Sequence, residues 1–371
     1  MKKNKKTFEI KTLKSPKLVF SIISLLIIGL FFGILIGDIL VQQIGYKIVF
    51  KTLSILSKLW LMGYIATFIG GIFEFRSWMK FIAFFTYPFI KLGKFSNVSG
   101  ASFLTAFISS KAANSLIVSS YKDDKISRRE MFLCGACNSC AIQFSHYIRI
   151  MFRFIGLSGM VGVYYYSFNL GTCLILILLF TILNNYLISK KNKSNLEESG
   201  SDIKQAEEKI QHKILSWKAT FKRSNSRAFK LLLRMLIVST PLYFLSQYLI
   251  VSGILKNLQN YMPKLIAEFI TPEVMSVLVA RLGGLTSAAT VGGALLKDGT
   301  ISQLEFLFAL IIANIITNPI RTVRRNLPNA LSIFPKYDGF YLVLMLQTIR
   351  FLFAVIAIVI LGLIIYNTGG N

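Results

Sequence analysis

The sequence predicts an all-α polytopic membrane protein, built from two inverted repeats with re-entrant hairpins and interrupted helices, plus one extra N-terminal span. Three observations predict this fold. Hydrophobic residues make up 54% of the 371 positions, charged residues only 16%, and the mean hydropathy is +0.60. The nonapeptide KDDKISRRE at 122–130 returns as KDGTISQLE at 297–305, which is 175 residues further on. The hydrophobic segments around the two copies share that offset, as in an internal duplication.

The composition excludes an ordinary soluble domain, which is roughly 45–50% apolar and roughly 25% charged. The chain carries 42 Lys and Arg against 16 Asp and Glu. These basic residues gather before the first apolar segment and in the polar stretch after residue 189. Basic segments that flank apolar spans are typical of the cytoplasmic side of a membrane protein. We therefore expect a multi-pass protein of the cell membrane, with the lipid bilayer as its partner and no nucleic acid.

The first half contains six hydrophobic segments that differ in length and composition. Residues 18–40 form an uncleaved first span, because they can cross a hydrocarbon core of about 30 Å and no clear signal-peptide cleavage site follows. The other five segments of this half are 46–73, the short aromatic 78–92, 101–121 with a polar centre, the helix 127–151, and 168–188. The polar centre of 101–121 must face protein or water, because unsatisfied polar groups in hydrocarbon are costly.

Shifting the first half by 175 residues places it over the second half. The matching segments are 229–252, 253–267, 276–296, 302–326 and 343–363. This correspondence divides the chain into four parts: 1–45, the cytoplasmic N-terminus and first transmembrane helix; 46–190, repeat one; 191–228, a charged cytoplasmic linker; and 229–371, repeat two. Within the linker, residues 203–217 could form an amphipathic surface helix.

Both copies of the repeated peptide contain Ser-x-x-Glu before an apolar run. This pattern predicts a capping box, in which the Ser side chain accepts from the Glu backbone N–H and the Glu carboxylate reaches back. Ser127 with Glu130, and Ser302 with Glu305, are therefore expected to begin two helices.

Charge decides the expected orientation of the two halves. With the N-terminus and linker inside and 78–121 forming a re-entrant hairpin, the 122–130 loop lies inside and the 297–305 loop outside. The inner copy has four basic residues and the outer copy only Lys297, which agrees with the positive-inside rule. Arg149 and Arg153 fall near the outer face and count against this scheme. Inverted repeats remain the favoured interpretation, and they leave the C-terminus outside.

Inverted repeats with short or interrupted segments predict a midplane binding site between the halves. Candidate liners are the polar residues inside the repeated segments: Ser110, Lys111, Asn114, Asn138, Ser139, Gln143, Arg281, Thr286, Ser287, Asn314 and Asn318. Ser139 aligns with Asn314 at the repeat offset. The Ser, Thr and Asn side chains could equally serve helix packing. Lys111 and Arg281 are stronger candidates, because a charge inside a hydrophobic segment is costly and usually functional.

Two further features leave alternatives open. Cys134, Cys137 and Cys140 recur at helical spacing, with His146 further along, so they could line a path for a soft metal or simply pack as small apolar residues. Pro319 removes a backbone donor within an apolar helix, which could mark either an unwound point or a plain kink.

The segments GASFLTAFISSKAANSLIVSSYKDDKISRREMFLCGACNS and VLVARLGGLTSAATVGGALLKDGTISQLEFLFALIIANI resemble two copies of the Gate, or nucleoside-recognition, membrane module. That module is similar across concentrative nucleoside transporters, the membrane region of ferrous iron transporters and spore maturation membrane proteins. The resemblance covers roughly 54–190 and 229–365. A phosphate-binding G-x-x-x-x-G-K-[ST] loop is absent from the sequence, so the resemblance does not extend to the GTPase part of iron transporters.

Three hypotheses for the function follow. The first is a secondary transporter or permease of a small polar solute, nucleoside-like or anionic. The second is a divalent-metal permease, and the third is a non-transporting membrane maturation or structural factor. We expect no enzyme and no cofactor, because the membrane segments lack paired carboxylates or a nucleophile relay. Besides lipid, the expected partners are a small-molecule or ion substrate and either a second copy of the chain or another membrane protein.

Overall fold

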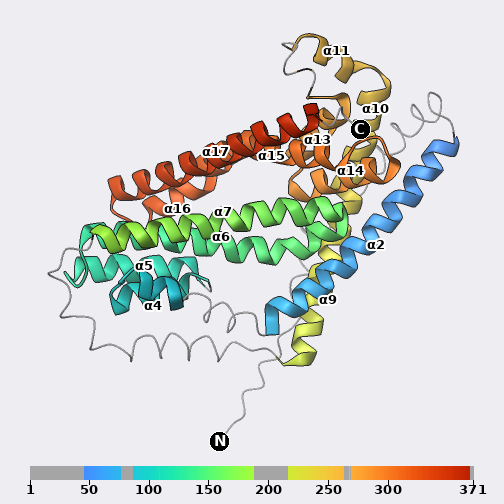
Figure 1. Ribbon diagram of the computed structural model, residues 1–371. Coiled ribbons are helices and arrows are strands. Elements are labelled where there is room, and N and C mark those ends of the chain that lie inside the picture. Colours follow the sequence, from blue (N-terminus) through green and yellow to red (C-terminus); the bar gives the residue numbers. More distant parts are fainter. Residues whose placement is uncertain are drawn as a thin grey trace, which may run out of the picture.

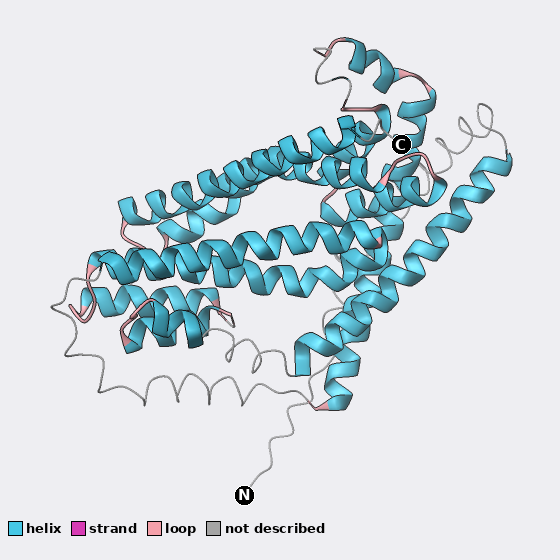
Figure 2. Ribbon diagram, viewed as in Figure 1, coloured by secondary structure: helices cyan, strands magenta, loops and turns pink. Residues whose placement is uncertain are grey.

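The computed structural model describes residues 46–76, 87–107, 109–187, 216–262, 267 and 269–367 (Figure 1). These residues form helices and connecting loops, with no strand among them (Figure 2). The all-α prediction is confirmed for this part of the chain. The predicted first span at 18–40 and the surface helix at 203–217 lie outside it, apart from the last two residues of the latter.

The helices of the first half are α2 (Tyr46–Arg76), α4 (Asn97–Ala106), α5 (Ser110–Lys122), α6 (Arg128–Ser158) and α7 (Met160–Leu187). The second half contains α9 (Trp217–Arg234), the π-helical turn η2 (Met235–Ser239), α10 (Thr240–Val251), α11 (Ile254–Asn260), α13 (Pro272–Leu282), α14 (Leu285–Asp298), α15 (Gln303–Arg321), the π-helical turn η3 (Thr322–Asn326), α16 (Leu327–Leu331) and α17 (Lys336–Asn367).

The helix boundaries repeat at the offset seen in the sequence. The pairs α4 and α13, α5 and α14, and α6 and α15 each begin 175 residues apart. Each half also places a two-helix hairpin against the long helix that follows it, α4–α5 against α6 and α13–α14 against α15. The order of these elements is therefore duplicated along with the sequence pattern.

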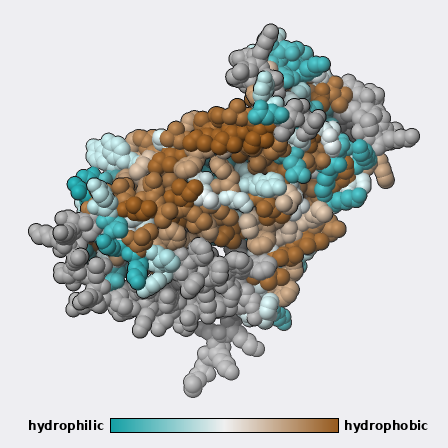
Figure 3. Space-filling view, viewed as in Figure 1, coloured by the Kyte–Doolittle hydropathy of each residue, from teal (hydrophilic) through white to brown (hydrophobic). Residues whose placement is uncertain are grey.

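Five helical segments of the described chain are long and apolar enough to cross a membrane. They are Phe50–Ile72, Met160–Leu187, Trp217–Val251, Gln303–Leu331 and Tyr337–Asn367. The space-filling view shows apolar side chains along the face that α17 covers, with hydrophilic residues toward α11 (Figure 3). The chain is accordingly a membrane protein with several apolar helices.

Two of the predicted segments are divided by a turn. The segments 101–121 and 276–296 were expected to be single elements, yet each is broken into two short helices. In the first half Ser109 has an extended backbone and caps α5 by accepting from the Ala112 N–H. In the second half Gly284 has a φ of 114°, a conformation that side-chain-bearing residues rarely adopt. The two-helix hairpins therefore cover 97–122 and 272–298, and the start of the re-entrant hairpin predicted over 78–121 lies outside the described residues.

Local backbone signals also shift two other boundaries. Helix α9 begins at Trp217, inside the predicted linker, because the Ser216 side chain caps it by accepting from the Ala219 N–H. Pro319 lies inside α15, and the helical run continues through η3 into α16. A π-helical turn follows Pro319 and the helix does not end there, so the structure has a local distortion of a continuous helical run, closer to the plain kink than to the unwound point.

Two hydrophobic clusters share the long central helices. One joins the α4–α5 hairpin to α6, α7 and α17, and the other joins α2, α9 and α10 to the α13–α14 hairpin and α15. Helices α6, α7 and α17 contribute to both clusters. In Figure 1 the two hairpins lie toward opposite ends of the α6–α7 pair. Helix α6 therefore contacts both hairpins.

Candidate functional site

The first polar cluster ties α6 to both arms of the α4–α5 hairpin. Asn138 is fully buried in α6. Its Nδ2 donates to Ser102 Oγ at 2.9 Å and to Asn114 Oδ1 at 3.3 Å, and the Ser102 hydroxyl donates to the Ala113 carbonyl at 2.8 Å. The structure thus brings together Asn138 and Asn114, two of the predicted liners, through a serine that was not among them.

Glu130 corrects the prediction of two capping boxes. Ser302 and Glu305 form the complete box at the start of α15. At the start of α6 the Ser127 side chain accepts from the Glu130 N–H, but the carboxylate turns away to accept from the Ser96 N–H at 3.0 Å and the Ser99 hydroxyl at 2.7 Å. Glu130 is only 3% exposed. It therefore fastens the start of α4 to α6 in place of completing its own cap.

The second polar cluster crosses from one half of the chain to the other. Arg281, in the last turn of α13, is 4% exposed. Its Nη2 donates to Asn314 Oδ1 at 2.9 Å, and Asn314 Nδ2 donates to the hydroxyl of Tyr165 on α7. Arg281 and Asn314 were both predicted liners, and Tyr165 was not. We call these three residues, together with Tyr166, the junction.

The three consecutive tyrosines at 164–166 differ in their exposure. Tyrosines such as those at 164–166 are typical of a membrane interface. Tyr164 is 49% exposed, whereas Tyr165 and Tyr166 are buried. Their rings pack against Phe154 at centroid distances of 5.3 Å. Helical geometry explains the difference, because neighbouring residues point about 100° apart.

Arg350 is a functional candidate that the sequence reasoning missed. It is the single charged residue within the predicted span 343–363, and that isolation was the available signal. Its Nη2 lies 4.0 Å from Cys140 Sγ. Tyr147 of α6 lies near enough to interact with the charges of both Arg350 and Arg281.

An exposed basic cluster lies beside the junction. His146 and Arg149 of α6 gather with Arg321 and Arg325 of the α15–η3 run, and the charge of Arg321 also reaches Arg281. The ion pairs found among the described residues use their carboxylates elsewhere, in Lys51–Asp298 at 2.6 Å and Arg128–Asp338 at 2.8 Å. The junction and its surroundings are consequently rich in positive charge.

The remaining predicted liners lie apart from these two clusters. Lys111 and Ser110 are exposed at the start of α5, so Lys111 is not the buried charge that the sequence suggested. The others lie as follows: Ser139 donates to the Gly135 carbonyl, Ser287 accepts from the Ser239 hydroxyl, Gln143 lies near Tyr147, Thr286 is buried in α14, and Asn318 is half-buried in α15.

The four cysteines are free and buried. Cys134 Sγ lies 3.4 Å from the Ser99 carbonyl, and Cys140 contacts Arg350. His146 is exposed and surrounded by arginines. No group of three His, Cys, Asp or Glu that could hold a metal ion occurs in the described part of the chain. The geometry favours the packing interpretation of Cys134, Cys137 and Cys140.

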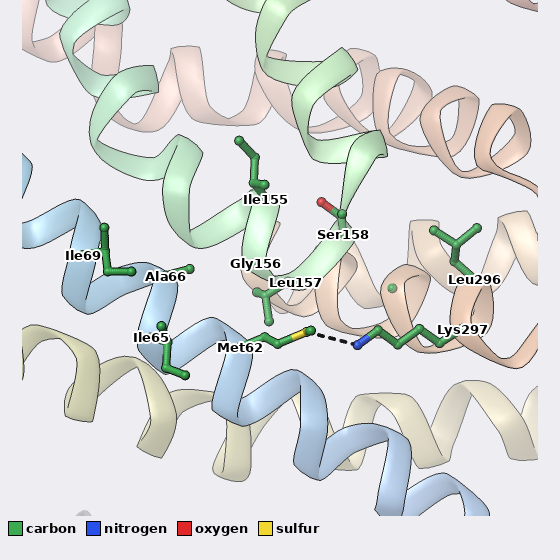
Figure 4. Close-up of a pocket in the computed structure, with 12 residues that line it drawn as sticks. Met62, Ile65, Ala66, Ile69, Ile155, Gly156, Leu157, Ser158, Leu296 and Lys297 are labelled. Atoms are coloured by element: carbon green, nitrogen blue, oxygen red, sulfur yellow. Dashed lines mark hydrogen bonds between the residues drawn. The ribbon is translucent and has the colours of Figure 1, made fainter.

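An open groove of about 410 Å³ also lies between the two halves (Figure 4). Helix α2 forms one wall, the end of α6 forms another, and Leu296 and Lys297 of α14 close it. Lys297 extends across the groove toward Met62, with 3.4 Å between Nζ and Sδ. Its walls are otherwise mostly apolar, so it suits hydrocarbon better than a polar solute.

Comparison with known proteins finds relatives of similar length. Three uncharacterized proteins of Methanocaldococcus jannaschii are 22%, 24% and 19% identical to this chain. The alignments cover 80%, 69% and 83% of this chain and 91%, 77% and 98% of the relatives. No family model matches the chain. No solved structure matches it either. The alignments therefore cover most of both chains, and the names of the relatives assign no function.

Proposed function

We propose that the protein is a secondary transporter or permease of a small polar solute, and that the solute passes through the junction. The observation that carries this proposal is the hydrogen-bonded chain Arg281–Asn314–Tyr165, which links the two halves inside a largely apolar helical core. Polar and charged side chains in membrane helices are costly and usually belong to substrate paths.

We also propose that the two halves are inverted Gate repeats. The shared 175-residue offset of three helix pairs and the paired two-helix hairpins support a duplication. Hairpins and distorted helices at matching positions of two halves are the arrangement expected around a midplane site. Both π-helical turns, η2 and η3, lie in the second half, beside Pro241 and Pro319.

Uptake into proteoliposomes tests the transport proposal. The full chain is reconstituted and mixtures of labelled nucleosides, organic anions and divalent metals are offered, with protein-free liposomes as the blank. We expect uptake of at least one polar solute. Asn314→Ala should reduce that uptake at least about tenfold, because it removes both bonds that join Arg281 to Tyr165. Asn329→Ala, at an exposed position of α16, is the matched control and should transport normally.

Three outcomes would contradict parts of this proposal. Uptake that is unchanged in Asn314→Ala would remove the junction from the solute path. Absence of uptake for every solute, together with tight co-purification of a second membrane protein, would instead support a non-transporting maturation or structural factor. Uptake of divalent metal that depends on Cys134, Cys137 and Cys140 would favour the metal-permease alternative.

A further inference from the structure

Arg281 holds a positive charge inside the protein that no carboxylate of the described residues neutralises. The side chain is 4% exposed. Its Nη2 bonds to Asn314, whereas Nη1 is buried without a hydrogen-bond partner. The ion pairs of the described chain, Lys51–Asp298 and Arg128–Asp338, lie elsewhere. The guanidinium therefore keeps unused donor capacity at the junction.

A structural role explains only part of this arrangement. Arg281 sits in the last turn of α13, where the helix dipole favours a cation. Its bond to Asn314 also holds the hairpin against α15. Neither interaction accounts for the unsatisfied Nη1, and a buried charge is destabilising unless a partner compensates it.

A second unpartnered donor lies in the same region. The Tyr166 hydroxyl is buried without a hydrogen-bond partner, and it lies near enough to interact with the charge of Arg281. Arg350 is a further guanidinium, and its charge interacts with Tyr147 as that of Arg281 does. Guanidinium groups only donate hydrogen bonds, and a hydroxyl can do so. Such a set is complementary to an oxyanion, which only accepts.

The exposed basic cluster of His146, Arg149, Arg321 and Arg325 gives an anion a favourable approach. Its charges are concentrated at one place on α6 and the α15–η3 run, and Arg321 interacts with Arg281. Positive charge gathered on one part of a surface raises the local concentration of anions there.

We propose that the junction binds a small solute bearing a carboxylate or phosphate group, with Arg281 Nη1 and the Tyr166 hydroxyl as its donors. This inference rests on the proposed function, because it names the chemical class of the solute at the same site. Arg281 supplies the charge, and Asn314 fixes the orientation of the guanidinium.

Thermal unfolding of the purified full chain tests the inference, because a ligand that binds the folded state raises its melting temperature. The probes are inorganic phosphate, succinate, a nucleoside monophosphate and the corresponding uncharged nucleoside, all at equal ionic strength with chloride as the reference. We expect stabilisation by at least one anion and none by the nucleoside. Arg281→Gln and Tyr166→Phe should each weaken the anion's affinity by about tenfold or more.

Matched controls separate binding from folding. Arg324→Gln removes one positive charge from an exposed position of η3 and should bind the anion as the wild type does. In anion-free buffer Tyr166→Phe should melt no lower than the wild type, because it removes a buried hydroxyl that has no partner.

The possible results either support or overturn the anion site at the junction. A lower melting temperature for Arg281→Gln, with wild-type anion binding by Tyr166→Phe, would make Arg281 a structural tie and overturn the inference. Stabilisation by the uncharged nucleoside alone, or by none of the probes, would overturn it as well, and in the first case the transport proposal survives. Arg281-dependent anion binding without any uptake into proteoliposomes would support the anion site and refute transport.

Discussion

At the scale of single residues, Glu130 and Glu305 show how one motif takes two roles. Both follow a Ser-x-x-Glu pattern and both serines cap a helix. Glu305 bonds back to its own cap. Glu130 bonds to the start of α4 because the hairpin brings Ser96 and Ser99 beside it. The sequence repeats the cap, and the tertiary contact redirects the carboxylate.

Glu130→Gln should therefore destabilise the protein more than Glu305→Gln. The first change weakens two hydrogen bonds to a buried charge, for which we expect a loss of about 1–3 kcal/mol. The second weakens a helix cap, for which about 1 kcal/mol is typical. Thermal unfolding of the two purified variants measures the difference. Equal shifts would show that the bonds from Glu130 to α4 add nothing to an ordinary cap.

Lys297 should give the protein an alkaline pH dependence. Desolvation by its surroundings at the groove, followed by the nearby positive charge of Lys58, lowers the pKa of Lys297 below its usual 10.5. The folded state then binds the proton less well than the unfolded chain, so stability should rise as pH increases toward 10.5 and the penalty is complete at lower pH.

Lys297→Met should accordingly melt slightly higher at neutral pH and show less gain in stability as pH rises, measured as melting temperature from pH 7 to 10. The effect should be small because Lys297 is largely exposed. Lys122→Met, at the equivalent exposed position of the first repeat, is the control and should follow the wild-type profile. Parallel profiles for all three proteins would exclude Lys297 as the source of the pH dependence.

The residue scale is also where sequence reasoning was least complete. Asn114, Asn138, Arg281 and Asn314 were identified because polar groups are conspicuous in apolar segments. Tyr165 and Tyr166 were not identified, because the sequence alone does not show which way a tyrosine points. Lys111 looked buried until the 101–121 segment proved to contain a turn, which places it at an exposed helix start.

At the scale of elements, the contact between α14 and α6 depends on a glycine. A Cβ on Gly293 would collide with the backbone carbonyl of Leu157 at the end of α6. Backbone atoms cannot move aside as a flexible side chain can, so the helices would have to separate. This contact joins the second hairpin to the first half of the chain.

Gly293→Ala should therefore lower the free energy of unfolding by about 1–3 kcal/mol, the usual cost of overpacking. Gly171→Ala in α7 is the control, because nothing lies within 4 Å of its added Cβ. That control should be neutral or gain up to about 1 kcal/mol, since alanine is the better helix former. Unfolding in denaturant, monitored by size-exclusion chromatography, measures the change in the free energy of unfolding for both variants. Similar behaviour of the two variants would mean that α14 and α6 are not held this closely.

Sequence reasoning performed better for elements than for residues. The 175-residue offset predicted which helix of the second half corresponds to each helix of the first, because duplicated segments keep similar caps and apolar runs. It missed the breaks at Ser109 and Gly284, since an apolar run with small residues reads as one span. It also left Pro319 undecided between an unwound point and a kink. The outcome depends on how neighbouring helices satisfy the backbone carbonyl that loses its partner at a proline.

At the scale of the whole molecule, the two halves form one helical body in which α6, α7 and α17 serve both hydrophobic clusters. The bidentate Arg128–Asp338 pair adds a polar link between the start of α6 and the start of α17. The hydrogen bond to Asp338, with its charge, raises the pKa of Arg128. The guanidinium of this link therefore stays charged across the working pH range.

Inverted orientation of the repeats predicts that their equivalent loops lie on opposite sides of the membrane. Lys125 and Thr300 occupy corresponding positions of the two loops, and both are exposed. The four native cysteines are buried, so they should react little with a charged, membrane-impermeant maleimide. In whole cells Thr300→Cys should therefore be labelled and Lys125→Cys should not, whereas inside-out vesicles should give the reverse. The basic residues around Lys125 support this assignment through the positive-inside rule. Labelling of both variants from the same side would make the halves parallel repeats, and the duplication would then place its two hairpins on one face of the membrane.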